Sequence, residues 1–186
     1  LLAKIFSKIK KTPSDVKIYQ DLYFMCKEAL SQDEVLAIKY IKLLSNVIEN
    51  QIVTLLDEED IRFLFTLHKK VLLLGAPIDF ESYLLYVEWE RDLDKKFYVP
   101  RRKVLSPTVA AMQDLIDDKL DLLTISMPPG TGKSTIGIFF LSWVMGKFPD
   151  GQNLASAHSG VLTRSFYDGV YQIITDPEYL WRDVFP

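Results

Sequence analysis

The fold prediction starts from residues 127–135, which read Met-Pro-Pro-Gly-Thr-Gly-Lys-Ser-Thr. A phosphate-binding loop needs small residues, so that consecutive backbone N–H groups can point inward and surround anionic oxygens. It also needs a lysine that reaches the outer phosphates and a hydroxyl that holds Mg²⁺, with the start of a helix behind them. Gly130, Gly132, Lys133 and Ser134 match these requirements.

One position departs from the usual Gly-x4-Gly-Lys-[Ser/Thr] pattern, because Met127 stands where the first glycine is expected. That glycine eases the exit from a preceding strand, so its replacement weakens the match only modestly. The alternative interpretation is a Gly-rich turn followed by a chance Lys-Ser pair. The unbroken run from Pro128 to Thr135 favours the phosphate-binding loop, and it predicts that the chain binds a nucleoside triphosphate.

The sequence on either side of this loop predicts alternating strands and helices. Residues 120–126 form a short apolar run suited to a buried strand, and residues 153–158 resemble a second strand. Apolar residues at helical spacing follow each of them, over 134–145 and 161–174. Because strand, turn, helix, strand and helix are how a parallel α/β sheet begins, we expect the first part of an α/β P-loop NTPase fold.

The N-terminal part of the sequence predicts a series of amphipathic helices. The first covers residues 16–30, and the second opens at Ser31 with Glu34 in the capping-box position. A third begins in the acidic residues 57–60, which suit the positive end of a helix dipole, and ends before Gly75. This half of the chain is therefore expected to be all-helical. His68 is predicted to lie on a helix surface.

The boundary between the two parts is predicted at a change of composition. A fourth helix is expected over about 79–93, and a basic, proline-containing segment follows over 94–103. We therefore predict a helical N-terminal region over residues 1–95. The first part of an ATPase domain is predicted over residues 96–186.

Composition limits the function further. The 186 residues carry a formal charge of −3, which argues against a chain coated in basic charge for nucleic acid. A single cysteine, Cys26, favours a reducing compartment. No apolar run approaches the roughly 18 residues that a membrane span needs, and residues 1–9 lack the features of a signal peptide. Because the chain begins with Leu1 and not Met, we expect it to be a piece of a longer protein.

The sequence lacks the acidic motif that works with a phosphate-binding loop in ATP hydrolysis. An ATPase motor also needs an acidic strand end downstream, with an Asp that holds the metal and a Glu that activates water. No apolar strand with such an end follows Ser134, and Asp176-Pro177-Glu178 has the pattern of a helix exit. We therefore expect this sequence to contain the nucleotide-binding half of an active site without the catalytic base.

Several segments together resemble the ATPase domain of the large terminase subunit of tailed phages. The resemblance covers about residues 97–186, roughly half the chain. It rests on residues 101–105, 126–129, the loop itself, 153–159, 162–167 and 176–186. It implies an ATP-driven motor that packages DNA into an empty capsid. The endonuclease activity of that family is expected only from residues outside this chain.

The resemblance also implies roles within the loop. Lys133 would be the catalytic contact to the β- and γ-phosphates, and Ser134 would bind Mg²⁺. Gly130, Thr131 and Gly132 would supply backbone N–H groups to the ATP phosphates, with Thr135 adding one near the α-phosphate. Terminases often place an arginine inside this loop as a γ-phosphate sensor, and here that position is vacant. A trigger arginine is therefore expected from elsewhere, such as a neighbouring subunit.

In related motors the region upstream of the loop packs against adenine. The candidates in this sequence are Tyr98, Arg101, Arg102 and Gln113. The arginine pair has two alternative interpretations, a solvated basic linker or a contact to DNA phosphates. His158, at the end of the second expected strand, is a further candidate for sensing nucleotide or contacting DNA. The alternative interpretation is a hydrogen-bonded histidine with a structural role.

The partners that the resemblance implies are double-stranded DNA, the portal and the small terminase subunit. A homo-oligomer is expected in the active state, in the host cytoplasm and transiently at the procapsid portal, without a membrane. Two other functions stay open. One is a different DNA-dependent P-loop ATPase, such as a helicase or a clamp-loader-like enzyme. The other is a non-catalytic, nucleotide-gated module whose helical half binds a protein.

Overall fold

A computed structural model describes residues 15–186 of the chain, so residues 1–9, which lack signal-peptide features, lie outside the described part. The chain divides into two compact units between Gly75 and Ala76. This division comes earlier than the predicted boundary at residues 95/96. The reason is that helix α5 (Phe80–Val87) packs with elements that follow it in the chain.

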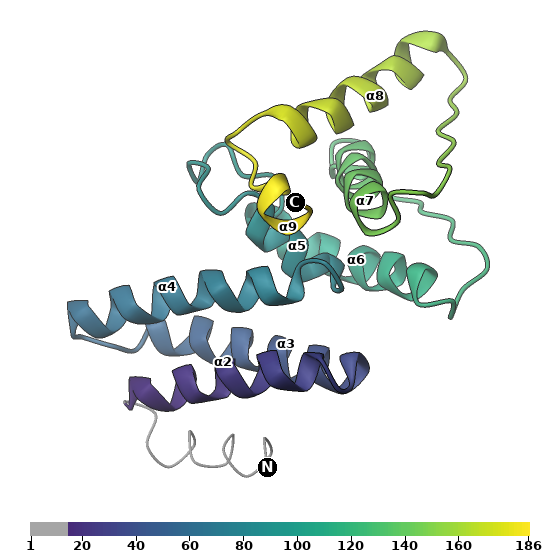
Figure 1. Cartoon of the computed structure of the whole chain (residues 1–186). Helices are drawn as coiled ribbons and strands as arrows, with labels where there is room; N and C mark the ends of the chain where they lie inside the picture. Colours follow the sequence, from purple (N-terminus) through teal and green to yellow (C-terminus); the bar gives the residue numbers. More distant parts are fainter. Residues whose placement is uncertain (1–14) are drawn as a thin grey trace. The chain divides into compact units, whose positions relative to one another are not determined.

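The described residues of the first unit form three helices, α2 (Val16–Leu30), α3 (Glu34–Ile52) and α4 (Glu58–Gly75), in agreement with the predicted periodicity (Figure 1). The first two begin at aspartates, because the side chains of Asp15 and Asp33 accept hydrogen bonds from backbone N–H groups in the first turn. The predicted cap at Ser31 is wrong. Its hydroxyl instead donates to the carbonyl of Glu28 at the end of α2, at 2.7 Å.

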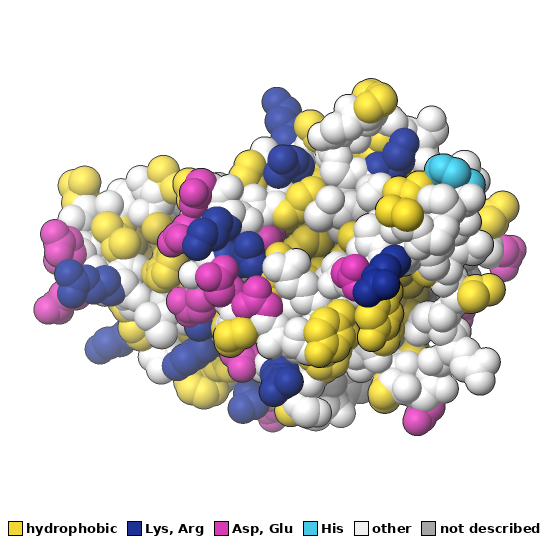
Figure 2. Space-filling view, turned by 90° about the horizontal axis from the view of Figure 1, so that it is seen from above, with side chains coloured by type: hydrophobic (Ala, Val, Ile, Leu, Met, Phe, Trp, Pro, Cys, Tyr) yellow, Lys and Arg dark blue, Asp and Glu magenta, His cyan; other side chains and the backbone are white. Residues whose placement is uncertain are grey.

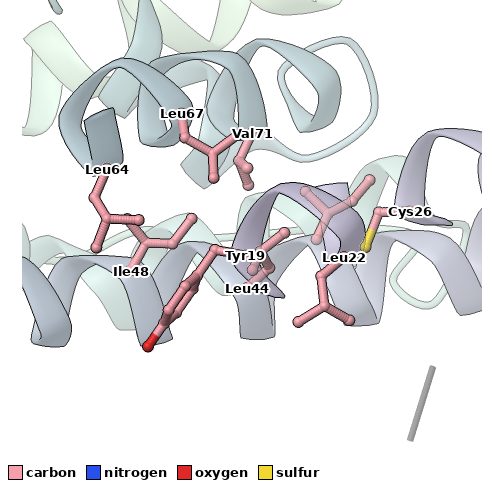
Figure 3. Close-up of a cluster of buried hydrophobic side chains, with 9 residues drawn as sticks. Tyr19, Leu22, Cys26, Leu44, Ile48, Leu64, Leu67 and Val71 are labelled. Carbon is pink, nitrogen blue, oxygen red and sulfur yellow. The ribbon is translucent and has the colours of Figure 1, made fainter. Parts of the chain in front are cut away.

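The core of this unit is formed where the apolar faces of α2, α3 and α4 meet (Figure 3). Cys26 lies in it as a small core residue. The buried members of this cluster are Tyr19, Leu22, Cys26, Ile41, Leu44, Ile48, Leu64, Leu67 and Val71. Its side chains come from all three helices, so each helix depends on the other two to remove its apolar stripe from water.

The predicted surface position of His68 is wrong. His68 is buried on α4, and its Nε2 lies 2.8 Å from the hydroxyl of Ser45 on α3. A buried imidazole needs such a partner, because an unsatisfied polar group in the core costs about 1–3 kcal/mol. The pair therefore connects α3 and α4 inside the unit.

The second unit is also helical (Figure 1). Its elements are α5, the short 3₁₀-helix η1 (Val99–Arg101), α6 (Arg102–Ile116), α7 (Lys133–Lys147), α8 (Gly160–Thr175) and α9 (Trp181–Val184). Helix α5 contacts α6, α7 and α9, and α7 also contacts α8. Trp143 of α7 is fully buried, and its indole N–H donates to the carbonyl of Ala76 at 2.8 Å. The hydroxyls of Tyr83 on α5 and Ser142 on α7 lie 2.6 Å apart, so α5 and α7 share both apolar and polar contacts.

The predicted α/β fold is wrong for the described residues, since residues 15–186 form helices and no strand. Neither expected strand is buried: Leu122 is 80 % exposed and Leu154 is 94 % exposed. No backbone hydrogen bond joins residues 120–126 or 153–158 to another described segment. An apolar run becomes a strand only when a second segment pairs with it, and the described part of the chain provides none.

Candidate functional site

The loop between residues 127 and 133 has a backbone that requires glycine. Gly130 has φ +81° and Gly132 has φ +96°, both in the left-handed region that other residues rarely adopt. A Cβ on Gly132 would also lie 2.6 Å from Cε2 of Phe97. The two glycines of the motif are thus explained by backbone conformation and, at Gly132, by a close neighbour.

Two hydrogen bonds close the loop on itself. The ammonium of Lys133 donates to the carbonyl of Met127 at 3.1 Å, across the whole loop. The hydroxyl of Thr131 donates to the carbonyl of Pro128 at 2.8 Å. Both side chains act within the loop, and Lys133 remains exposed. Among the described residues its ammonium has one acceptor, the neutral carbonyl of Met127, which an anion can replace.

Helix α7 begins at the last residue of the loop without a side-chain cap. Gly132 is the N-cap residue, and the first helical hydrogen bond runs from the N–H of Ile136 to its carbonyl at 2.9 Å. The N–H groups of Lys133, Ser134 and Thr135 precede that bond, so they have no acceptor within the helix. A helix start of this kind favours negative charge, because the free N–H groups and the helix dipole point the same way.

A cavity of about 420 Å³ lies over this loop. Arg101 lines it, although it lies far upstream in the sequence. The lining residues are Phe97, Arg101, Pro128, Pro129, Gly130, Gly132, Lys133, Ser134 and Thr135. Two of them are cations and none is a carboxylate. The site therefore presents two positive side chains, free backbone donors and hydroxyls, which is the chemistry of an anion site.

Phe97 is a member of this site that sequence reasoning missed. Its ring stacks on Phe139 of α7, with centroids 5.5 Å apart and planes 10° apart. The carboxylate of Glu88, which is 1 % exposed, accepts the N–H of Phe97 at 2.9 Å and the N–H of Tyr98 at 3.0 Å. Burial raises the pKa of Glu88, while these N–H groups and Arg91 oppose the rise. Glu88 thus fixes the backbone beside the loop.

The structure separates the upstream candidates. Only Arg101 lies at the cavity. Nε of Arg102 instead pairs with Glu81 at 2.9 Å, and the buried Tyr98 donates its hydroxyl to the same carboxylate at 3.2 Å. The side-chain oxygen of Gln113 accepts the N–H of Phe80 at 2.8 Å, at the start of α5. These three residues hold α5, η1 and α6 together.

Other sequence candidates lie outside this cavity. His158 is exposed in the non-helical segment before α8. Thr131 belongs to the loop but does not line the cavity.

A separate groove of about 530 Å³ between α7, α8 and residues 153–155 is lined mainly by apolar side chains, among them Leu141 and Phe166. Figure 2 shows one face of the molecule, where hydrophobic side chains are exposed among charges of both signs.

Comparisons with protein-family models, with curated proteins and with solved structures found no match. Two searches of the structure itself were also negative within the part it describes. No helix of residues 15–186 has the length and apolar character that crossing a bilayer requires. No group of three or more His, Cys, Asp or Glu side chains suited to a metal ion occurs among the same residues.

Proposed function

We propose that this chain binds the triphosphate of ATP, with Mg²⁺, in the cavity over residues 127–135. The observation that carries the proposal is the loop itself, in which two left-handed glycines precede an exposed lysine at an uncapped helix start. Lys133 would exchange its bond to the Met127 carbonyl for the β- and γ-phosphates. Such a charge-assisted contact is stronger than the neutral one that it replaces.

The residues present fit a magnesium ion held jointly with the nucleotide. Mg²⁺ usually binds few protein oxygens and keeps phosphate oxygens and waters as its other ligands. The exposed hydroxyl of Ser134, in the first turn of α7, would be the protein ligand. The ion would neutralise phosphate charge, while the loop holds the phosphates through backbone N–H groups and Lys133.

The proposed use of this site is ATP hydrolysis in a motor that packages phage DNA. The support is the resemblance of residues 97–186 to the large terminase subunit, together with the placement of Arg101 beside the loop. In this proposal the partners are double-stranded DNA, the portal and the small terminase subunit. The motor subunit would act as a homo-oligomer in the host cytoplasm, transiently at the procapsid portal.

The first test is a titration of the chain with MgATP, compared with Lys133→Ala. We expect the wild type to bind and the variant to lose about 100-fold or more in affinity, because it lacks a charge-assisted phosphate contact. The Lys133 side chain is exposed and makes one hydrogen bond within the described residues, so the variant should keep the circular-dichroism melting curve of the wild type. Equal affinity of both proteins for MgATP would refute the proposed site.

Turnover separates the proposed motor from its rivals. The intact protein should hydrolyse ATP, faster when double-stranded DNA is present, and Lys133→Ala should abolish this activity. Tight MgATP binding without turnover in the intact protein would favour a nucleotide-gated interaction module instead. Stimulation by a single strand, with unwinding of a duplex, would favour a helicase.

A further inference from the structure

Arg101 differs from its neighbour Arg102 in what surrounds its charge. Arg102 pairs with the carboxylate of Glu81, whereas Arg101 makes no ion pair within the described residues. One of its N–H donors, at Nη1, bonds the carbonyl of Phe97 at 3.1 Å. The residue is exposed. Among the described residues its guanidinium has one acceptor, a backbone carbonyl, so its other donors can bind an anion.

The position of Arg101 is fixed by its contacts to the cavity wall. Its Cδ lies 3.6 Å from the point that a Cβ of Gly132 would occupy, so its stem runs along the loop just before Lys133. Its guanidinium carbon lies 5.3 Å from the centroid of the Phe97 ring. Its backbone N–H donates to the carbonyl of Tyr98 at 2.9 Å, within the turn that Glu88 holds. These contacts hold the Arg101 side chain beside the loop before any ligand binds.

We propose that Arg101 is a second cation for the bound triphosphate, acting on the phosphates and not on the base. This inference rests on the proposed function of the loop. Arg101 and Lys133 line the same cavity, which contains no carboxylate to neutralise either of them. A guanidinium presents parallel N–H donors to phosphate oxygens, a geometry that lysine lacks.

The surroundings of Phe97 leave no free face of its ring for an adenine base. The Phe97 ring already stacks on Phe139 and carries the Arg101 guanidinium over it. An adenine would have to displace the guanidinium to reach that ring. A phosphate, in contrast, needs only the free N–H edge of Arg101 and leaves its packing on Phe97 unchanged.

The test measures the affinity of the chain for MgATP, MgADP and inorganic tripolyphosphate, using Arg101→Gln and Arg101→Lys. Tripolyphosphate has no base, so it isolates the phosphate contact. We expect Arg101→Gln to lose about tenfold or more in affinity for both MgATP and tripolyphosphate, and less for MgADP. Arg101→Lys should recover part of the loss, because it restores the charge without the planar donors.

Lys103→Gln is the matched control, since it removes one positive charge from an exposed position two residues later, in the first turn of α6 and outside the cavity. It should leave all three affinities within about twofold of the wild type. If Arg101→Gln weakened MgATP and left tripolyphosphate unchanged, the arginine would act on the base and the inference would be overturned. Unchanged affinity for every ligand would also overturn it, while leaving the proposed function intact. A wild type that binds neither MgATP nor tripolyphosphate would instead overturn the proposed function.

Discussion

The unit that contains α2, α3 and α4 and the region of the loop differ in what their polar side chains bind. In the unit of α2, α3 and α4, the buried His68 finds its partner, Ser45, inside the same core. At the loop, Lys133 and Arg101 are exposed, and among residues 15–186 they bond only to backbone carbonyls. Packing accounts for the first pair, whereas it does not account for two cations beside one cavity. Two cations that have no carboxylate partner among the described residues, beside one cavity, can bind an anionic ligand.

The largest effect that this comparison predicts is a loss of stability confined to the first unit. Leu44 is fully buried in the cluster of Figure 3. Leu44→Ala should lower the free energy of unfolding of this unit by about 2–5 kcal/mol, because it removes buried apolar area and leaves a cavity. The affinity for MgATP should stay within about twofold of the wild type. Urea denaturation followed by circular dichroism, with an ATP titration at low urea, measures both.

The neighbouring residue offers a matched control for that substitution. Leu43 is the same residue type on the same helix, but it is 43 % exposed. Leu43→Ala should cost less than about 1 kcal/mol. If Leu44→Ala abolished ATP binding at temperatures where α7 and α8 remain folded, the two units would be coupled and the comparison would fail.

The second prediction is that alanine substitutions at the two glycines of the loop differ in their effects on stability and MgATP binding. Gly132→Ala places a Cβ 2.6 Å from the Phe97 ring in a left-handed conformation, so we expect a loss of about 1–3 kcal/mol in stability and a loss of MgATP binding. Gly130→Ala meets nothing within 4 Å, and its cost should be limited to about 1–2 kcal/mol of backbone strain. Equal effects of both variants on stability and binding would show that the contact between Phe97 and Gly132 is unimportant.

Helices and the loop could be predicted from the sequence because the information for both is local. The repeat of apolar residues identified α2, α3, α4, α7 and α8. The motif residues of the loop are contiguous, so Gly130, Gly132, Lys133 and Ser134 necessarily come together at the start of α7. A turn and the first residues of a helix need no distant partner to define them.

What could not be predicted depends on distant partners. Residues 120–126 have the composition of a strand, but a strand also requires a pairing segment, which the described residues lack. The burial of His68 depends on Ser45 on another helix. The same limit applies to the arginine pair, because only the position of Glu81 shows that Arg102 is paired.

The smallest predicted effect lies in the core of the first unit and appears only in alkali. Burial raises the pKa of the Cys26 thiol to about 11. The unfolded chain, with an ordinary thiol pKa near 9.0, therefore loses its proton first as the pH rises. The free energy of unfolding that this thiol contributes is fully present below pH 9 and falls above it. At pH 9.5 the loss is about 1 kcal/mol.

Cys26→Ala isolates this contribution from other groups that titrate in the same range. Unfolding curves at pH 7.5 and 9.5 should show a larger drop in stability for the wild type than for the variant. MgATP affinity should not differ between the two proteins at either pH, because the thiol lies in the α2–α4 core and not at the loop. An identical drop in both proteins would mean that water reaches Cys26, and the core of the first unit would then be less closed than the packing of its three helices requires.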